Sequence, residues 1–277
     1  MICFPVAKIN LGLNVVERRA DGYHNLQTVF YPVPLCDALE VQVMDGRFPS
    51  AVDCDLKVTG IDVGGGEQQN LVVKAYNLLK RYFDSLPRVH AHLFKGIPAQ
   101  AGMGGGSSDG AAMLKLLNDM FGLGLSVEQL IDYAVKLGAD CPFFILGRAA
   151  YAEGIGERLK PIDLDLRGWW MAVVKPDTPV STREAFSLIH PHRPESCCLD
   201  IIRQQPVGSW RDRLKNDFEQ SVFALHPEIG DIKDRFYERG AAYAAMSGSG
   251  SAVYGLFDNE PNLSDCFPDL FVRVLRL

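Results

Sequence analysis

The sequence lacks the features that mark several large classes of protein. No run of apolar residues approaches the ~20 needed to cross a lipid bilayer, and no basic segment precedes the apolar start of the chain. There is no Cys-x-x-Cys pair, no internal repeat and no low-complexity tract. These absences disfavour a membrane-spanning helix, a cleaved signal peptide, a thioredoxin-like motif and a cysteine-rich zinc site.

An excess of positive charge is also missing. The 277 residues include 28 Lys and Arg against 34 Asp and Glu, for a net charge of -6. This balance gives no general attraction to nucleic acid or anionic membranes, so an anionic ligand would need a local binding device. The seven cysteines are odd in number and scattered, which predicts reduced thiols in a cytoplasmic protein.

The sequence does contain a mixture of helical and strand periodicity. Hydrophobic residues make up 47% of the chain, which is enough for a sizeable buried core. The patterns predict helices over residues 70–83, 107–121, 126–137 and 216–239 and strands over 6–15, 89–94, 169–174 and 252–257. Ser126 followed by Gln129 is typical of a capping box. The expected class is α+β, with a linker at 159–168 separating domains 1–160 and 161–277.

A glycine-rich loop between a predicted strand and a predicted helix is the strongest local signal. It reads Pro98-Ala99-Gln100-Ala101-Gly102-Met103-Gly104-Gly105-Gly106-Ser107-Ser108-Asp109. The glycines allow close approach of a ligand to the main chain, and the helix that follows offers free N–H groups, so the loop predicts an anion site. No lysine precedes the serines as a P-loop requires, and Ser107 stands where a dinucleotide fingerprint needs glycine. A flexible hinge is the remaining alternative.

This loop resembles the second motif of the GHMP kinases, and three other stretches agree with that family in the right order. They are residues 5–11 (PVAKINL), 137–144 (LGADCPFF) and 246–252 (MSGSGSA). The resemblance spans residues 5–257. It implies an N-terminal domain like the second domain of ribosomal protein S5, then a ferredoxin-like domain, with the active site in the cleft between them.

Two further stretches narrow the resemblance to one branch of the family. Residues 19–24 (RADGYH) and 152–157 (AEGIGE) are similar to the kinases of the non-mevalonate isoprenoid pathway that phosphorylate the 2-hydroxyl of 4-diphosphocytidyl-2-C-methyl-D-erythritol. This resemblance implies ATP and Mg²⁺ as cofactors. The alternatives are a kinase for mevalonate, homoserine or a sugar, or a catalytically inactive ligand-binding relative.

The resemblance also assigns roles to individual residues. Asp140 is the expected catalytic base, and Lys8 is its expected partner. Without the resemblance, Asp140 would be a helix cap or part of a structural ion pair, and Lys8 would be a solvated lysine. The glycine-rich loop from Pro98 to Ser108 is expected to hold the ATP phosphates. Ser107 and Ser108 are expected to contact phosphate or magnesium, or to cap the helix. The protein ligands of the metal stay open, with Ser108 as a possible one.

Two nucleotide pockets complete the expected site. Asn70 and Lys95 are expected to line the adenine side, with a helix cap and a surface lysine as the alternatives. The expected contacts with the cytidine substrate are Asn10, Tyr23, His24 and Phe186. An aromatic ring can stack on a pyrimidine and His24 can hydrogen-bond its edge, although each ring alone is more often part of a core.

Overall fold

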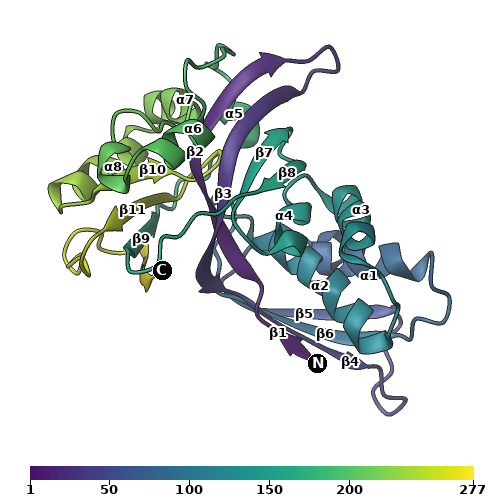
Figure 1. Ribbon diagram of the computed structural model, residues 1–277. Coiled ribbons are helices and arrows are strands. Elements are labelled where there is room, and N and C mark those ends of the chain that lie inside the picture. Colours follow the sequence, from purple (N-terminus) through teal and green to yellow (C-terminus); the bar gives the residue numbers. More distant parts are fainter. The chain divides into compact units, whose positions relative to one another are not determined.

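The computed structural model describes residues 1–277, which form two compact units, each assembled from separate stretches of chain (Figure 1). The first unit comprises Met1–Ala7, Leu35–Ala99 and Gly104–Arg148, and the second comprises Lys8–Pro34, Gln100–Met103 and Ala149–Leu277. This division differs from the single boundary expected at residue 160, because Lys8–Pro34 and Gln100–Met103 pack with the C-terminal part of the chain. No helix is long and apolar enough to cross a membrane.

The first unit is built on a four-stranded sheet with the order β1-β4-β6-β5. Its strands are β1 (Ile2–Cys3), β4 (Ala38–Val43), β5 (Cys54–Gly60) and β6 (Val89–Lys95). In β6, Val89, Ala91 and Leu93 are buried, whereas His92 and Phe94 are exposed. This alternation gives the sheet one apolar face, which packs against helices, and one face in contact with water.

Four helices belong to this unit: α1 (Leu71–Lys80), α2 (Gly105–Phe121), α3 (Val127–Leu137) and α4 (Cys141–Leu146). The predicted capping box at Ser126 and Gln129 is confirmed at the start of α3. Gly110 lies inside α2, where glycine usually weakens a helix. A Cβ atom there would stand 2.9 Å from Cβ of Leu71, so glycine permits α1 and α2 to pack closely.

The second unit contains two sheets. One has the order β2-β3-β7-β8, from β2 (Val6–Arg18), β3 (His24–Cys36), β7 (Ala150–Gly154) and β8 (Arg158–Pro161). The other has the order β10-β11-β9-β12, from β9 (Trp170–Lys175), β10 (Tyr243–Met246), β11 (Val253–Phe257) and β12 (Phe271–Arg276). The expected linker at 159–168 thus begins inside a strand.

The second of these sheets has the strand arrangement expected of a ferredoxin-like domain. β11 lies between β9 and β10, the two strands that the helical crossover connects, and it is antiparallel to both. β12 pairs with the other side of β9, also antiparallel. No helix lies between β11 and β12. Buried side chains of the loop between these strands, including Leu263 and Phe267, cover part of the core instead.

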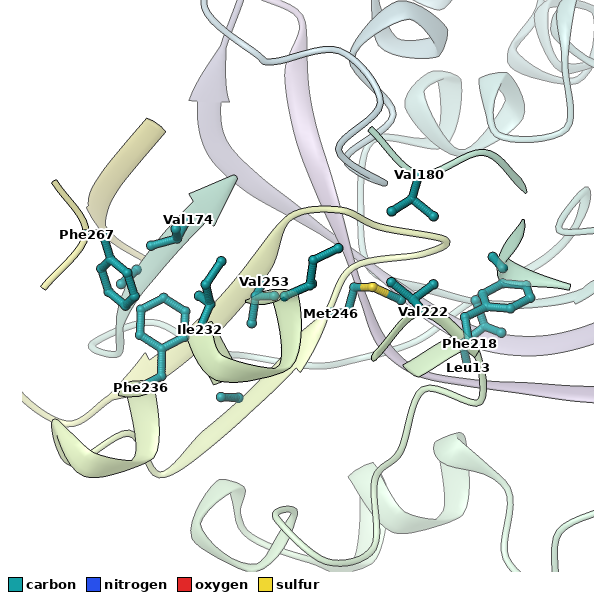
Figure 2. Packing of buried hydrophobic residues seen from close by; sticks show 14 of the residues in the cluster. Leu13, Val174, Val180, Phe218, Val222, Ile232, Phe236, Met246, Val253 and Phe267 are labelled. Carbon is teal, nitrogen blue, oxygen red and sulfur yellow. The ribbon is translucent and has the colours of Figure 1, made fainter. Parts of the chain in front are cut away.

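The crossover contains the helices α5 (Thr182–Ala185), α6 (Cys198–Gln204), α7 (Phe218–Leu225) and α8 (Pro227–Glu238). The interruption predicted near Pro227 is confirmed, because this residue begins α8, where its missing N–H is not needed. Figure 2 shows the core that these elements share, in which Leu13 of β2 lies beside Phe218 at one end and Phe236 lies at the other. The core therefore anchors β2, the strand that bears Lys8.

Candidate functional site

Lys8 is buried within β2 and is held by two neutral oxygen atoms of its own unit. Its side-chain nitrogen Nζ donates hydrogen bonds to Oδ1 of Asn10 at 2.6 Å and to the carbonyl oxygen of Gly102 at 2.7 Å. It also lies 5.0 Å from the centre of the Phe30 ring. Two residues predicted for the site, Lys8 and Asn10, are therefore in direct contact, as their positions on one strand face indicated.

The tip of the first glycine-rich loop packs against the second glycine-rich loop, residues 247–251. Gly102 has a φ of 69°, and a Cβ atom there would stand 1.8 Å from the carbonyl oxygen of Ser247. The Ser247 hydroxyl donates to the carbonyl of Gly102 at 2.9 Å, and the N–H of Ser251 donates to the carbonyl of Gln100 at 3.0 Å. Only glycine fits at position 102, which brings these two motifs together beside Lys8.

The other half of the first loop forms the start of α2. Gly104 precedes the helix with a φ of 70° and offers no side-chain cap, and no acidic residue lies in the first turn. Gly106 is exposed, and a Cβ atom there would have no neighbour within 4 Å. Uncapped N–H groups at an accessible helix N-terminus favour an anion.

The two serines of the loop have different surroundings. Ser107 is half-buried, near the Cys141 thiol, whose pKa is raised to about 11 chiefly by burial. Ser108 is buried and lines a hollow of about 410 Å³ beneath the N-terminal segment, which also contains Cys3 and Lys115. Ser107 is therefore the more accessible hydroxyl at the helix start.

Lys95 is buried as an ion pair, in contrast to the surface position that its pattern allowed. Its Nζ contacts Oδ2 of Asp37 and lies 2.6 Å from Oδ2 of Asp109. Oδ1 of Asp37 accepts the N–H groups of Gly96 and Ile97 at 2.6 and 2.8 Å. The side chain is thus used inside the first unit, and a contact between Lys95 and adenine remains a prediction.

Asn70 caps α1 and borders a hollow of about 430 Å³. Its Oδ1 accepts the N–H of Val72 at 2.9 Å. The hollow is lined by residues 58–67 together with Gln69 and Asn70, and it includes the three consecutive glycines at 64–66. At its base the N–H of Ile61 donates to the carbonyl of Lys95 at 2.9 Å, so the main chain of Lys95 lies next to this hollow.

Two of the residues predicted for the cytidine substrate form an aromatic pair. The rings of His24 and Phe186 are stacked, with centres 4.5 Å apart and planes inclined by 20°. Burial and, to a lesser extent, the charge of Arg18 lower the pKa of His24, which favours the neutral imidazole. Tyr23 is 61% exposed beside this pair, so its ring is accessible to a ligand.

Asp140 is placed by the junction between α3 and α4. It is half-buried and immediately precedes α4, with Pro142 in the first turn of that helix. The N–H of Cys141 donates to the carbonyl of Gly138, which fixes the backbone on both sides of Asp140. No side chain caps α4, so Asp140 is not an N-cap in the hydrogen-bonding sense.

Sequence reasoning missed three buried polar residues that support these segments. Thr28 accepts a hydrogen bond from Asn10, and Asn216 donates from Nδ2 to the carbonyls of Met246 and Gly248, each at 2.8 Å. Glu219 accepts the N–H of Met246 at 2.8 Å. The only signal was a polar residue within an apolar pattern, and that signal does not identify a partner 18 to 32 residues away.

No group of three or more His, Cys, Asp or Glu side chains is arranged to hold a metal ion. A magnesium ion commonly takes most of its ligands from substrate phosphates and water, with few from the protein. The hydroxyl of Ser107 at the start of α2 suits such an arrangement, and an ion bound by protein carboxylates alone does not fit these residues.

Comparison with known proteins matches this chain to two family models. Residues 70–148 match the N-terminal domain of the GHMP kinases, and residues 202–267 match their C-terminal domain. The chain belongs to the GHMP kinase family. It is therefore a small-molecule kinase, and the expected two-domain α+β fold is confirmed.

Several relatives are much closer than the family as a whole. A 4-diphosphocytidyl-2-C-methyl-D-erythritol kinase of Bacteroides fragilis is 53% identical over 264 residues, which cover 95% of this chain and 94% of that protein. The same-named kinase of Parabacteroides distasonis is 50% identical over 273 residues, covering 96% of this chain and 97% of its own. The chain thus belongs to the branch of the GHMP kinases that its sequence motifs indicated.

Solved structures agree at two levels. A 4-(cytidine 5'-diphospho)-2C-methyl-D-erythritol kinase superimposes with a TM-score of 0.79 at 35% identity, over 92% of this chain and 90% of that one. The mevalonate kinase of Methanococcus jannaschii superimposes with a TM-score of 0.67 at 13% identity, over 100% of this chain and 98% of that one. The second match shows a shared fold alone.

Proposed function

We propose that this kinase transfers the γ-phosphoryl group of ATP to the 2-hydroxyl of 4-diphosphocytidyl-2-C-methyl-D-erythritol, a step of the non-mevalonate isoprenoid pathway. The observation that carries the proposal is the 53% identity, over 95% of the chain, to a relative with that name. The stacked rings of His24 and Phe186 support it, because an aromatic surface suits a pyrimidine base. The seven unpaired cysteines accord with a cytoplasmic location.

In this proposal the start of α2 binds the ATP phosphates, and adenine occupies the hollow beside Asn70. The N–H groups of Gly105 and Gly106 and the hydroxyl of Ser107 are the donors offered to the phosphates. A magnesium ion bound with ATP would neutralise part of the phosphate charge, and Ser107 is its candidate protein ligand.

Asp140 and Lys8 supply the remaining chemistry. Phosphoryl transfer requires mainly positioning and charge stabilisation, since the transition state is loose. Asp140 accepts the proton of the acceptor hydroxyl, and the Lys8 ammonium stabilises negative charge on the reacting oxygen atoms. A catalytically inactive relative would be expected to have lost Asp140 or Lys8, and this chain has both residues.

The substrate is tested by supplying magnesium, ATP and one acceptor at a time, and by detecting the products by ³¹P NMR. We expect rapid formation of a new phosphomonoester from 4-diphosphocytidyl-2-C-methyl-D-erythritol and none from mevalonate or homoserine. Rapid turnover of mevalonate or homoserine, without turnover of the cytidine compound, would overturn the proposal.

The phosphate site is tested by Gly106→Ala, because this change disturbs nothing else. The added methyl group meets no protein atom within 4 Å, and the backbone at Gly106 is not in the left-handed region. We expect an unchanged melting temperature and roughly tenfold weaker ATP binding by calorimetry, since the methyl group occupies space that a phosphate would use. Gly46→Ala, at another unobstructed glycine, is the matched control. Equal ATP affinity in both variants would contradict the phosphate site.

A further inference from the structure

A continuous chain of hydrogen bonds extends from the Lys8 side chain to the main chain of Gly12. Lys8 Nζ donates to Oδ1 of Asn10 at 2.6 Å, and Nδ2 of Asn10 donates to the Thr28 hydroxyl at 3.0 Å. That hydroxyl donates to the carbonyl of Gly12 at 2.5 Å. All four residues belong to the second unit. The sequence motifs had indicated only Lys8 and Asn10 as site residues.

The donors and acceptors in this series of hydrogen bonds can be arranged in one direction only, from Lys8 towards Asn10 and from Asn10 through Thr28 to Gly12. An ammonium group has no lone pair to offer, so the atom of Asn10 that meets Lys8 must be the amide oxygen. At the other end, the carbonyl of Gly12 can only accept, so the Thr28 hydroxyl must give its hydrogen to it. The hydroxyl then has only lone pairs left for Asn10, and these require the amide NH₂ group.

The backbone at Gly12 and Asn10 is closely packed. Gly12 has a φ of 68°, and a Cβ atom there would stand 2.6 Å from the Leu214 side chain, so the Gly12 backbone lies directly against that side chain. The carbonyl of Asn10 accepts the hydroxyl of Tyr254 at 2.7 Å. Thr28 is 1% exposed, so water has no access to replace its hydroxyl.

We propose that Thr28 is a positioning residue for catalysis, which fixes the direction of the Asn10 amide so that its oxygen, and not its NH₂ group, faces Lys8. The inference rests on the proposed role of Lys8. If the amide rotated by 180°, the NH₂ group would point at the ammonium, and Lys8 would lose an acceptor and move. A displacement of about 1 Å in such a group is enough to lower a rate 100-fold.

Thr28→Val tests this directly, because valine keeps the shape of threonine and removes the hydroxyl. We expect kcat to fall roughly 10- to 100-fold while KM for ATP stays unchanged, and Thr28→Ser to restore most of the loss. Tyr237→Phe is the matched control. It removes a hydroxyl that bonds the backbone of Ala244 in the same unit, and we expect it to leave kcat unchanged.

A double-mutant cycle separates positioning from a general loss of structure. In an Asn10→Ala background there is no amide to orient, so Thr28→Val should cause little further loss of kcat. Multiplicative losses in the cycle would contradict the inference, as would wild-type kcat in Thr28→Val. If Thr28→Val does not fold, Thr28→Cys carries the test, since its thiol is a weak donor and acceptor; wild-type kcat there would also overturn the inference. A wild-type protein that does not turn over the cytidine compound would instead refute the proposed function.

Discussion

Two lysines in this protein are equally buried, and each contacts a different set of oxygen atoms within its own unit. Lys8 and Lys95 are each 3% exposed. Lys8 donates to an amide oxygen and a main-chain carbonyl, whereas Lys95 contacts the carboxylates of Asp37 and Asp109. The two carboxylates hold Lys95 inside the first unit, whereas the two neutral oxygens of the second unit fix the direction in which the Lys8 ammonium group points. Burial alone therefore does not distinguish a functional lysine from a structural one, and the residues around each lysine must be compared.

The carboxylates around Lys95 join three separate parts of the first unit. Asp37 follows β3, Lys95 ends β6 and Asp109 lies in α2. A Cβ atom on Gly105 would stand 3.4 Å from Nζ of Lys95, so the ion pair lies directly under the start of α2. We interpret the Lys95 ion pairs as a structural support for the phosphate loop, and the Lys8 network as part of the reacting site.

The largest expected effect concerns Asp140, the base that the Lys8 network is proposed to assist. Asp140→Asn preserves the shape of the side chain but cannot accept a proton. We expect kcat to fall by about 10²–10⁴-fold, with little change in ATP affinity measured by calorimetry. Turnover at the wild-type rate in a folded Asp140→Asn protein would show that Asp140 has only a structural role.

Removing the charge of Lys95 should mainly affect stability. Lys95→Met leaves two carboxylates buried without their shared cation, and we expect the free energy of unfolding to fall by about 3–5 kcal/mol in urea titrations. Replacing all three residues by apolar ones of similar size should restore much of this loss, because no charge would remain buried. A Lys95→Met protein as stable as the wild type would contradict the structural role of Lys95.

The pH dependence of stability tests the role of Asp109 in the buried cluster around Lys95. Burial, against only partial compensation by the Lys95 charge, raises the pKa of Asp109 to about 7. Between the ordinary carboxyl pKa of about 4 and this value, the folded state holds a proton that the unfolded state has lost, so stability falls as pH rises. The contribution of Asp109 should be lost progressively up to about pH 7 and be absent from Asp109→Asn. Identical slopes in the two proteins, from unfolding titrations at pH 5–8, would contradict this.

The smallest expected effect lies at the aromatic pair, which contacts neither lysine in the structure. His24→Ala removes the ring stacked on Phe186. We expect KM for the cytidine substrate to rise several-fold, because one hydrogen-bonding group of the cytosine is left without its partner at a cost of about 1 kcal/mol. KM for ATP should stay nearly constant. A variant that binds ATP poorly but keeps its affinity for the cytidine substrate would mean that the two pockets are assigned the wrong way round.

Local patterns in the sequence were sufficient for much of the fold. The capping box at Ser126, the break at Pro227 and the alternation of β2 each depend on residues a few positions apart, and each was predicted. The short strands β10 and β12 were missed as separate elements, because four or six residues give little periodicity of their own. Strands β9 and β11 are as short, but a predicted linker and a glycine-rich loop precede them in the sequence. The assembly of the second unit from separate stretches depends on pairing between distant strands, which no local pattern reports.

The candidate site shows the same limit. The motifs indicated Lys8 and Lys95 alike, but the difference between them lies in partners that are distant in sequence. Asp37 is 58 positions from Lys95, and Gly102 is 94 positions from Lys8. Thr28 was not predicted at all, since one threonine in a strand carries no sign of the amide that it orients.

The most direct test of this account is the catalytic rate of Lys8→Met and Lys95→Met, each measured with the cytidine substrate well below the melting temperature of that variant. We expect that folded Lys8→Met loses about 10²–10³-fold in kcat, the usual effect of removing one charge-stabilising donor. We expect that Lys95→Met, once folded, keeps kcat within about fivefold of the wild type, because its ammonium acts on no reacting atom. A folded Lys8→Met protein with wild-type kcat, or a Lys95→Met protein as inactive as Lys8→Met, would contradict the assignment of the two lysines.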